Sequence, residues 1–198
     1  MEKKEMRIVT PEGRVSYPNL FEPSPDLKGV PKYSVRLMWP KTTDLMDLRR
    51  ILVGAIKAKF GEDKKDWPVV LRQNDLRQYI SPDGKNGWPL IDGDMSDKPE
   101  NAGMVYVNLK TDVKHRPQVV DGRRGNEPIL DPDEIYGGCY GKASVSAFAY
   151  AKEQKGVSLG LNNFQKTKDG EAFGASRVAA SDEFEPVAGS DLPPDEEF

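Results

Sequence analysis

Aromatic and basic side chains alternate with small apolar ones along residues 139–152. Tyr140, Lys142, Phe148 and Tyr150 belong to one alternating set, which also holds serines and contains no carboxylate. Successive side chains of a strand point to opposite faces, so the two sets lie on opposite sides of one sheet. A face of rings and cations suits a single-stranded nucleic acid, whose bases stack and whose phosphates are negative. A strand buried on both faces, with the aromatic residues as a second core layer, fits this stretch equally well.

Residues 104–113 repeat the same composition. Val105, Val107 and Leu109 face one way, and Tyr106 and Lys110 face the other. The apolar set is typical of a β-branched core, whereas the opposite set again offers a ring and a cation. Because two separate strands show this outer face, the repetition favours the nucleic-acid interpretation over a second core layer.

A basic loop follows this strand. Lys114, His115, Arg116, Arg123 and Arg124 lie within eleven residues, with Gly122 and Gly125 interleaved. Cations on a flexible loop beside a stacking face would hold phosphates, although an ordinary solvated loop has a similar composition. The candidate residues for binding single-stranded DNA are Tyr106, Lys110, Arg116, Arg123, Arg124, Tyr140, Lys142, Phe148 and Tyr150.

Catalytic chemistry has less support in the sequence. Asp92, Asp94, His115 and Asp121 could be combined into a metal site, which makes a metal-dependent nuclease the enzyme alternative. Two aspartates around a glycine are more often a turn than a pair of metal ligands. The sequence has a single histidine, so a nucleophile–imidazole pair would have to use His115. We expect no catalytic residue, metal or cofactor, and keep a structural or interaction module of a virion as a second alternative.

The elements that must position these residues are mostly strands. Alternation predicts strands in residues 6–17, 32–39, 104–113, 139–152 and 157–165, with a possible strand at 69–71 and a proline-rich loop at 18–31. Tyr33 and Trp39 share a face with Val35 and Leu37, so we expect them in the core. Trp67 and Trp88 should anchor the long segment 64–103.

One helix is expected at residues 43–60. Its leucines recur at three- and four-residue spacing, Thr43 or Asp44 can cap it, and Gly61 can end it. About seven short strands, one helix and no βαβ rhythm predict an all-β fold with one helix. The best match is a Greek-key OB-fold barrel with long decorated loops.

Composition bounds the class of protein. The 198 residues are 37% hydrophobic, with a mean hydropathy of -0.66. Cys139 is the single cysteine, so no disulfide can form within the chain, which fits a reducing compartment. The sequence has no run of apolar residues long enough to span a membrane, and we expect a protein of the host-cell cytoplasm.

Charge divides the chain into two parts. Residues 181–198 hold seven acids and no base, which leaves 29 Lys and Arg against 25 Asp and Glu, about +4, in residues 1–180. We expect an OB-fold domain at 1–180 and a disordered acidic tail at 181–198. Glu196, Glu197 and Phe198 are the candidate partner-binding residues of this tail, and a solubilising terminus is the alternative.

Five stretches carry a family resemblance: residues 14–21, 88–94, 138–145, 156–165 and 169–171. They resemble the phage-encoded single-stranded-DNA-binding proteins with an OB-fold, and the resemblance runs from about residue 14 to residue 173. It implies binding of single-stranded DNA with little sequence preference during phage replication or recombination. It also implies that the acidic tail recruits replication or recombination proteins, although Glu196 and Glu197 stand before Phe198 where the better-known bacterial tail has a proline.

Overall fold

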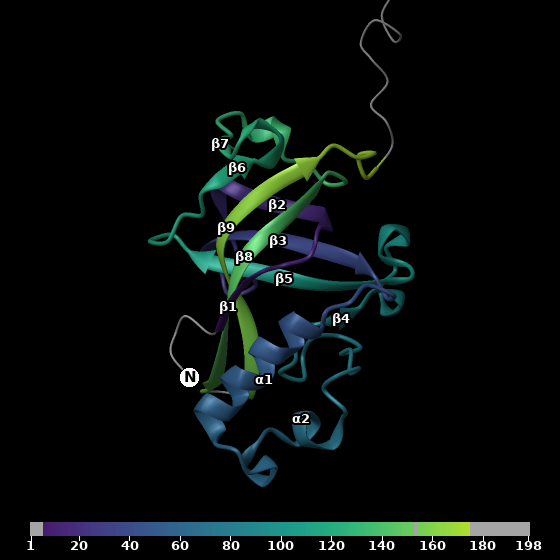
Figure 1. The fold of residues 1–198 in the computed structure, drawn as a ribbon, viewed down its shortest axis with the longest axis vertical. Helices are drawn as coiled ribbons and strands as arrows, with labels where there is room; N and C mark the ends of the chain where they lie inside the picture. Colours follow the sequence, from purple (N-terminus) through teal and green to yellow (C-terminus); the bar gives the residue numbers. More distant parts are fainter. Residues whose placement is uncertain (1–5, 153, 175–198) are drawn as a thin grey trace, which may run out of the picture.

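The computed structural model describes residues 6–152 and 154–174 (Figure 1). The strands are β1 (Arg7–Val9), β2 (Gly13–Pro25), β3 (Pro31–Pro40), β4 (Ile91–Asp92), β5 (Met104–Asp112), β6 (Val119–Asp121), β7 (Glu127–Pro128), β8 (Tyr140–Ala151) and β9 (Lys155–Lys168). The helices are α1 (Met46–Phe60) and the short α2 (Val69–Gln73). Single 3-10 turns are η2 (Lys64–Asp66), η3 (Gly93–Met95), η4 (Pro99–Asn101), η5 (Gly122–Arg124) and η6 (Pro132–Glu134).

Five strands close into a ring in the order β2, β3, β5, β9, β8 and back to β2. Neighbours in the ring are antiparallel, except that β5 and β9 run parallel where Lys110 lies opposite Gly160. The inward side chains are the apolar sets expected from alternation, and Val35, Leu37 and Val107 are almost fully buried. The ring is that of an OB-fold, so the prediction of an all-β protein with one main helix is confirmed.

The main helix covers the lower end of the ring. In Figure 1, α1 lies beside the lower half of the long β8–β9 hairpin, and it contacts both strands. Leu48, Leu52 and Ile56 recur on one side and are buried there. The helix begins at Met46, three residues later than expected, and the Asp44 carboxylate accepts the Met46 N–H at 2.8 Å.

Two predictions in the irregular parts are wrong. Residues 69–71 form the start of α2, because the Pro68 carbonyl accepts the N–H groups of Leu71 and Arg72. Residues 18–25 continue β2, with register shifts on either side of Asn19. A strand at the margin of a sheet tolerates prolines where no ladder bond is needed, so proline content alone does not show a loop.

The predicted anchors lie in the core. Trp67 is 5% exposed and donates its indole N–H to the Gly61 carbonyl at 2.9 Å. Trp88 is 1% exposed and donates to the Tyr79 carbonyl at 3.1 Å. Tyr33 and Trp39 are buried as expected. Within the described residues no helix is long and apolar enough to cross a membrane.

Candidate nucleic-acid interface

The outer face of β3 and β5 carries a layered group of rings and cations. The Arg36 guanidinium carbon lies 4.1 Å from the centre of the Tyr106 ring and 5.1 Å from that of Tyr17. Arg36 also donates through Nε to the Asn108 side-chain oxygen at 2.9 Å, which fixes the plane of the guanidinium. Tyr17 is 53% exposed, so its ring is open to solvent. We call Tyr17, Arg36 and Tyr106 the stacking group.

A second row crosses the sheet beside the stacking group. Lys110 on β5 lies opposite Ser34 on β3, and Ser34 lies opposite Asn19 on β2. On its other side Lys110 pairs with Gly160, and the Phe148 ring edge lies beside that glycine. Phe148 is 50% exposed. The outer surface therefore runs without interruption from Phe148 on β8 to Asn19 on β2.

The charge of this face is positive. Neither the outward positions of β3 from Lys32 to Met38 nor those of β5 from Met104 to Lys110 include a carboxylate. Asp112 ends β5, where the His115 ring contacts it at 2.7 Å. That contact, together with backbone hydrogen bonds from Lys114 and His115, holds the pKa of Asp112 below its usual value and outweighs the opposing effect of burial. The ligand face of an OB-fold is formed by its second and third strands, which are β3 and β5 here.

Similar proteins identify the family. A family model described as the ssDNA-binding protein of Enterobacter phage Enc34 matches residues 6–196. This chain belongs to that ssDNA-binding family. Putative protein p50 of Acyrthosiphon pisum secondary endosymbiont phage 1 is 32% identical over 186 residues, which are 92% of this chain and 95% of that protein.

Solved structures agree with the family assignment. The Enc34 single-stranded DNA-binding protein in complex with ssDNA has a TM-score of 0.63 and 27% identity, over 86% of this chain and 91% of that chain. The single-stranded DNA-binding protein gp2.5 of bacteriophage T7 has a TM-score of 0.53 and 16% identity, over 87% of this chain and 96% of that chain. At that identity the likeness shows the fold alone.

Two further candidates lie near the start of β8, where it pairs with β2. Tyr140 lies opposite Arg14, whose guanidinium is 5.9 Å from its ring centre, and Lys168 is 4.3 Å from the same centre. Lys142 is half-buried and pairs in register with Gln165. These residues face outward, as alternation predicts, and Tyr140 lies in the same row across the sheet as Tyr106, with Arg14 and Met38 between them.

Tyr150 packs against the protein. Its hydroxyl lies so close to Gly156 that a Cβ there would come within 2.6 Å of it, and Gly87 lies on the same side. Burial raises the pKa of the Tyr150 phenol. The alternation that placed Tyr150 outward is correct, but neighbouring glycines allow the ring to lie flat on the backbone instead of projecting into solvent.

The basic loop holds its arginines in ion pairs. Asp121 has a side chain that is 1% exposed, and it accepts from Arg123 at 2.9 Å and from Arg124 at 2.8 Å. Hydrogen bonds from Arg123 hold the pKa of this carboxyl well below its usual range. Arg123 also pairs with Asp169 at 2.5 Å, and Arg124 pairs with Glu134. The two arginines fasten η5 to the end of β9 and to η6.

Arg116 is exposed, as these two arginines are. It follows His115 in the loop after β5 and lines a cavity of about 420 Å³. Leu20, Phe21 and Ile129 supply apolar walls of the same cavity. Arg116 is thus the candidate of the basic loop that borders a hollow in the surface. Glu196, Glu197 and Phe198, the candidate partner-binding residues, lie outside the described residues.

The residues considered for a metal site do not come together. Lys41 holds Asp92 at 2.5 Å and Asp94 at 2.7 Å, His115 pairs with Asp112, and Asp121 pairs with arginines. Among residues 6–152 and 154–174, no group of three or more His, Cys, Asp or Glu side chains could hold a metal ion. Each of these carboxylates has a structural partner of its own.

Tyr17 and Arg36 are absent from the candidates derived from sequence. Arg36 alternates outward on β3, and this alternation could have identified it as a candidate from the sequence. Tyr17 had no such signal, because its backbone turns to φ 47° beside a register shift in β2. Only the folded strand brings the Tyr17 ring over Arg36.

Proposed function

We propose that this protein binds single-stranded DNA with little sequence preference, and that the outer face of β3 and β5 is the binding surface. The observation that carries the proposal is the stacking group, in which one guanidinium contacts two tyrosine rings, at 4.1 and 5.1 Å from their centres. Every base has a π face, so ring and guanidinium planes accept bases without reading their edges. The Enc34 relative solved in complex with ssDNA supports the same ligand.

The binding path extends from the stacking group toward β8. Lys110 contributes a phosphate contact and Phe148 an exposed ring, because both lie on the uninterrupted outer surface. Arg116 and the patch of Tyr140 and Lys142 add positive charge at either side of this path. Tyr150, Arg123 and Arg124 support the scaffold, since the first packs on glycines and the others hold buried Asp121.

We place this activity in phage replication or recombination within the host-cell cytoplasm, without catalysis. The acidic segment 181–198 would recruit replication or recombination proteins, with Glu196, Glu197 and Phe198 as its contacts. A terminal aromatic residue preceded by acids offers a ring and several negative charges to a basic, apolar pocket on such a protein.

A mobility-shift assay with a labelled oligonucleotide, with and without magnesium, tests this function. We expect a shift and an intact oligonucleotide in both conditions. Cleavage that requires magnesium would support a nuclease, and neither shift nor cleavage would support a virion module. Arg36→Ala should weaken the shift, whereas Lys59→Ala on the exposed side of α1 is the control and should leave it unchanged. Equal losses in both variants would mean that the β3–β5 face is not the site.

A further inference from the structure

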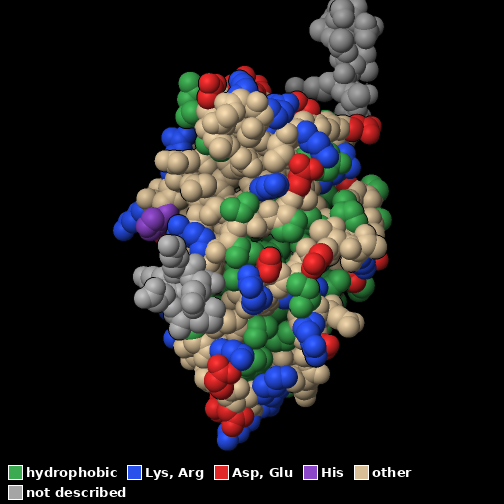
Figure 2. All heavy atoms as spheres, viewed as in Figure 1, with side chains coloured by type: hydrophobic (Ala, Val, Ile, Leu, Met, Phe, Trp, Pro, Cys, Tyr) green, Lys and Arg blue, Asp and Glu red, His purple; other side chains and the backbone are tan. Residues whose placement is uncertain are grey.

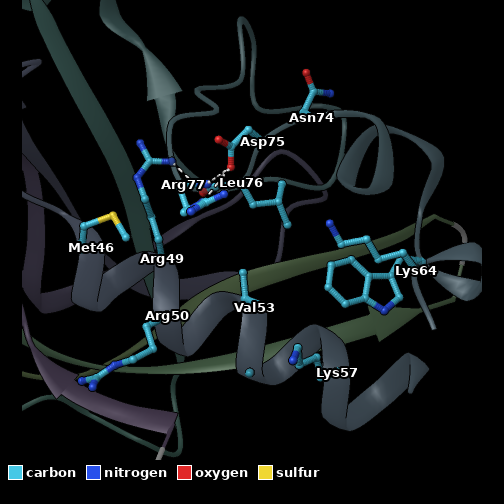
Figure 3. A pocket seen from close by; sticks show the side chains of 12 residues that line it. Met46, Arg49, Arg50, Val53, Lys57, Lys64, Asn74, Asp75, Leu76 and Arg77 are labelled. Carbon is cyan, nitrogen blue, oxygen red and sulfur yellow. Dashed lines mark hydrogen bonds and ion pairs between the residues drawn. The ribbon is translucent and has the colours of Figure 1, made fainter. Parts of the chain in front are cut away.

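A cavity of about 490 Å³ lies at the opposite end of the molecule from the last described residues. It lies between α1 and the segment that follows α2, and Figure 3 looks into it. Figure 1 places α1 and α2 at the lower end of the long axis, whereas the described chain ends at the upper end. The volume is in the range of small-ligand pockets. The proposed DNA-binding face does not include this cavity.

The floor of this cavity is apolar. Val53 is half-buried on α1, and Trp67 and Leu76 are 5% and 7% exposed on the facing segments. Met46, which is 46% exposed, stands at one edge. A flat apolar group the size of a phenylalanine ring would find an aromatic and two aliphatic walls here.

Arg49 gives the cavity a buried positive charge. It is 8% exposed, and the carbonyls of Leu76 and Tyr79 accept from its Nη1 at 3.2 and 2.7 Å. Burial lowers the pKa of Arg49, and Asp75 counteracts this only as the smaller influence. Among the described residues Arg49 forms no ion pair. A buried guanidinium held by neutral carbonyls favours an incoming carboxylate.

The rim adds exposed cations. Arg50 pairs with Asp47 at 3.1 Å, Lys57 with Glu62 at 2.7 Å and Arg77 with Asp75 at 3.3 Å. All these side chains are more than 40% exposed, and exposed pairs of this kind contribute little. Lys64 stands over the Trp67 ring with its nitrogen 6.0 Å from the ring centre. The rim cations can therefore change partner at small cost.

We infer that this cavity binds residues 181–198 of a second copy of the protein, with the Phe198 ring on the apolar floor and the carboxylate of Glu196 or Glu197 at Arg49. Residues 181–198 carry seven acids and no base, and they end in an aromatic residue. Both features complement an apolar floor with a cationic rim. The chemistry recognised is an acidic peptide with an aromatic residue beside its carboxylates.

The placement of the two parts favours a second copy over the same copy. Twenty-four residues follow Gly174, and a chain of that length spans at most about 80 Å when fully extended. Its root-mean-square span as a flexible chain is only about 27 Å. Because the segment starts at one end of the molecule and the cavity lies at the other, copies aligned head to tail bring them together.

A contact of this kind is heterologous, so it can repeat without closing. A repeating head-to-tail contact arranges protein copies in a row, and copies bound along one DNA strand also lie in a row. The contact should therefore make binding to long single strands cooperative. This last consequence rests on the proposed function, whereas the contact itself does not require DNA.

Anisotropy with a labelled peptide of residues 189–198 tests the cavity in the absence of DNA. The full-length protein should bind the peptide. Arg77→Glu should weaken that binding about tenfold, because it replaces a rim cation by a charge of the same sign as the peptide's and places that charge beside Asp75. Lys59→Glu is the matched control, because Lys59 is exposed on the same helix and does not line the cavity. A peptide with Phe198→Ala, or with Glu196 and Glu197 both replaced by Gln, should also bind about tenfold more weakly. Equal losses in Arg77→Glu and Lys59→Glu, or unchanged binding in Arg77→Glu, would overturn the assignment.

Sedimentation velocity of mixed variants distinguishes a second copy from the same copy. Arg77→Glu keeps the terminal segment and Phe198→Ala keeps the cavity, so each alone should fail to associate and an equimolar mixture should form dimers. The unmodified protein should form longer species as its concentration rises. If it stays monomeric while Phe198→Ala binds the peptide more tightly than it does, each segment occupies its own cavity and the second-copy inference fails.

DNA then tests the consequence. Arg77→Glu should keep its affinity for an oligonucleotide that holds one protein and lose cooperativity on long poly(dT) by about tenfold. Unchanged cooperativity on the long strand would refute the head-to-tail chain. A failure of every variant, and of the unmodified protein, to bind the short oligonucleotide would instead contradict the proposed function and leave the peptide result to decide the cavity.

Discussion

Replacing Tyr106 by alanine should weaken DNA binding much more than it weakens the fold. The ring is half-buried on the outer face of β5, and Arg36 lies 4.1 Å from its centre. The substitution removes a stacking surface and one of the two rings that flank Arg36. Loss of a base–aromatic stack costs about 1–3 kcal/mol of binding, which corresponds to roughly 5- to 150-fold in Kd. The lost cation–π contact costs only about 0.5–1 kcal/mol of folding.

The assay is fluorescence anisotropy with a short labelled oligo(dT), accompanied by urea unfolding of each variant. Tyr106→Phe keeps the ring and should keep the affinity. Tyr150→Ala is the informative contrast, because it removes the same side chain from a strand of the same ring. Since Tyr150 packs over Gly156 and burial raises its pKa, we expect a loss of about 1.5–3 kcal/mol in unfolding free energy with Kd unchanged.

One result would refute the reasoning. If Tyr106→Ala stays folded and binds as tightly as the unmodified protein, no base stacks on this ring and the β3–β5 face is not the binding surface. If Tyr150→Ala instead loses affinity while its unfolding curve does not change, the binding path follows the β8–β9 hairpin toward its tip.

Three further outcomes follow from the same surfaces. With four to five phosphates contacted, log K should fall with log salt at a slope of about -3 in titrations of a short oligonucleotide, and binding that ignores salt would contradict the electrostatic contribution. Deleting residues 181–198 should tighten binding to that oligonucleotide most clearly at low salt, because a tethered segment with seven acids competes with DNA for the basic face; an unchanged Kd at low salt would mean that it does not. Hydrogen bonds from Lys166 and Arg123 lower the pKa of Asp169 to about 2, below its unfolded value, so this carboxylate stabilises the fold above pH 4 and loses that effect as the pH falls from about 4 to about 2. Urea unfolding at several pH values in this range should show the unfolding free energy falling with pH. Asp169→Asn should make that fall smaller.

The strands of the ring could be predicted because each one has a buried and an exposed face. Val105, Val107 and Leu109 alternate with polar residues on β5, and the same period appears on β3 and β8. The short strands had no such pattern. β6 has three residues, and it pairs with β9 through Val119 opposite Phe164, a contact between residues 45 positions apart. Nothing local to β6 predicts that pairing.

The stacking group was only partly predictable for a related reason. The outward direction of Tyr106 could be predicted, because it alternates with the buried residues Val105 and Val107 on β5. Tyr17 depends on a register shift that turns its backbone to a left-handed conformation, which is uncommon for a residue other than glycine. β2 pairs with β3 on one side and with β8 on the other, and β8 lies far from β2 in the sequence. The residues around Tyr17 therefore do not predict the register shift by themselves.

The basic loop shows how charge pattern and charge partner differ. Five positive or potentially positive residues in eleven predicted a flexible clamp, because two of the three acids that meet Arg123 and Arg124 come from other parts of the chain. Asp169 follows β9 and Glu134 lies in η6, and both reach the loop only when the ring has closed. Asp121 was visible in the sequence, but its burial was not, and burial is what makes two arginines necessary. A cation on the outer face, such as Lys110 on β5, therefore has more freedom to bind phosphate than an arginine that already compensates a buried carboxylate.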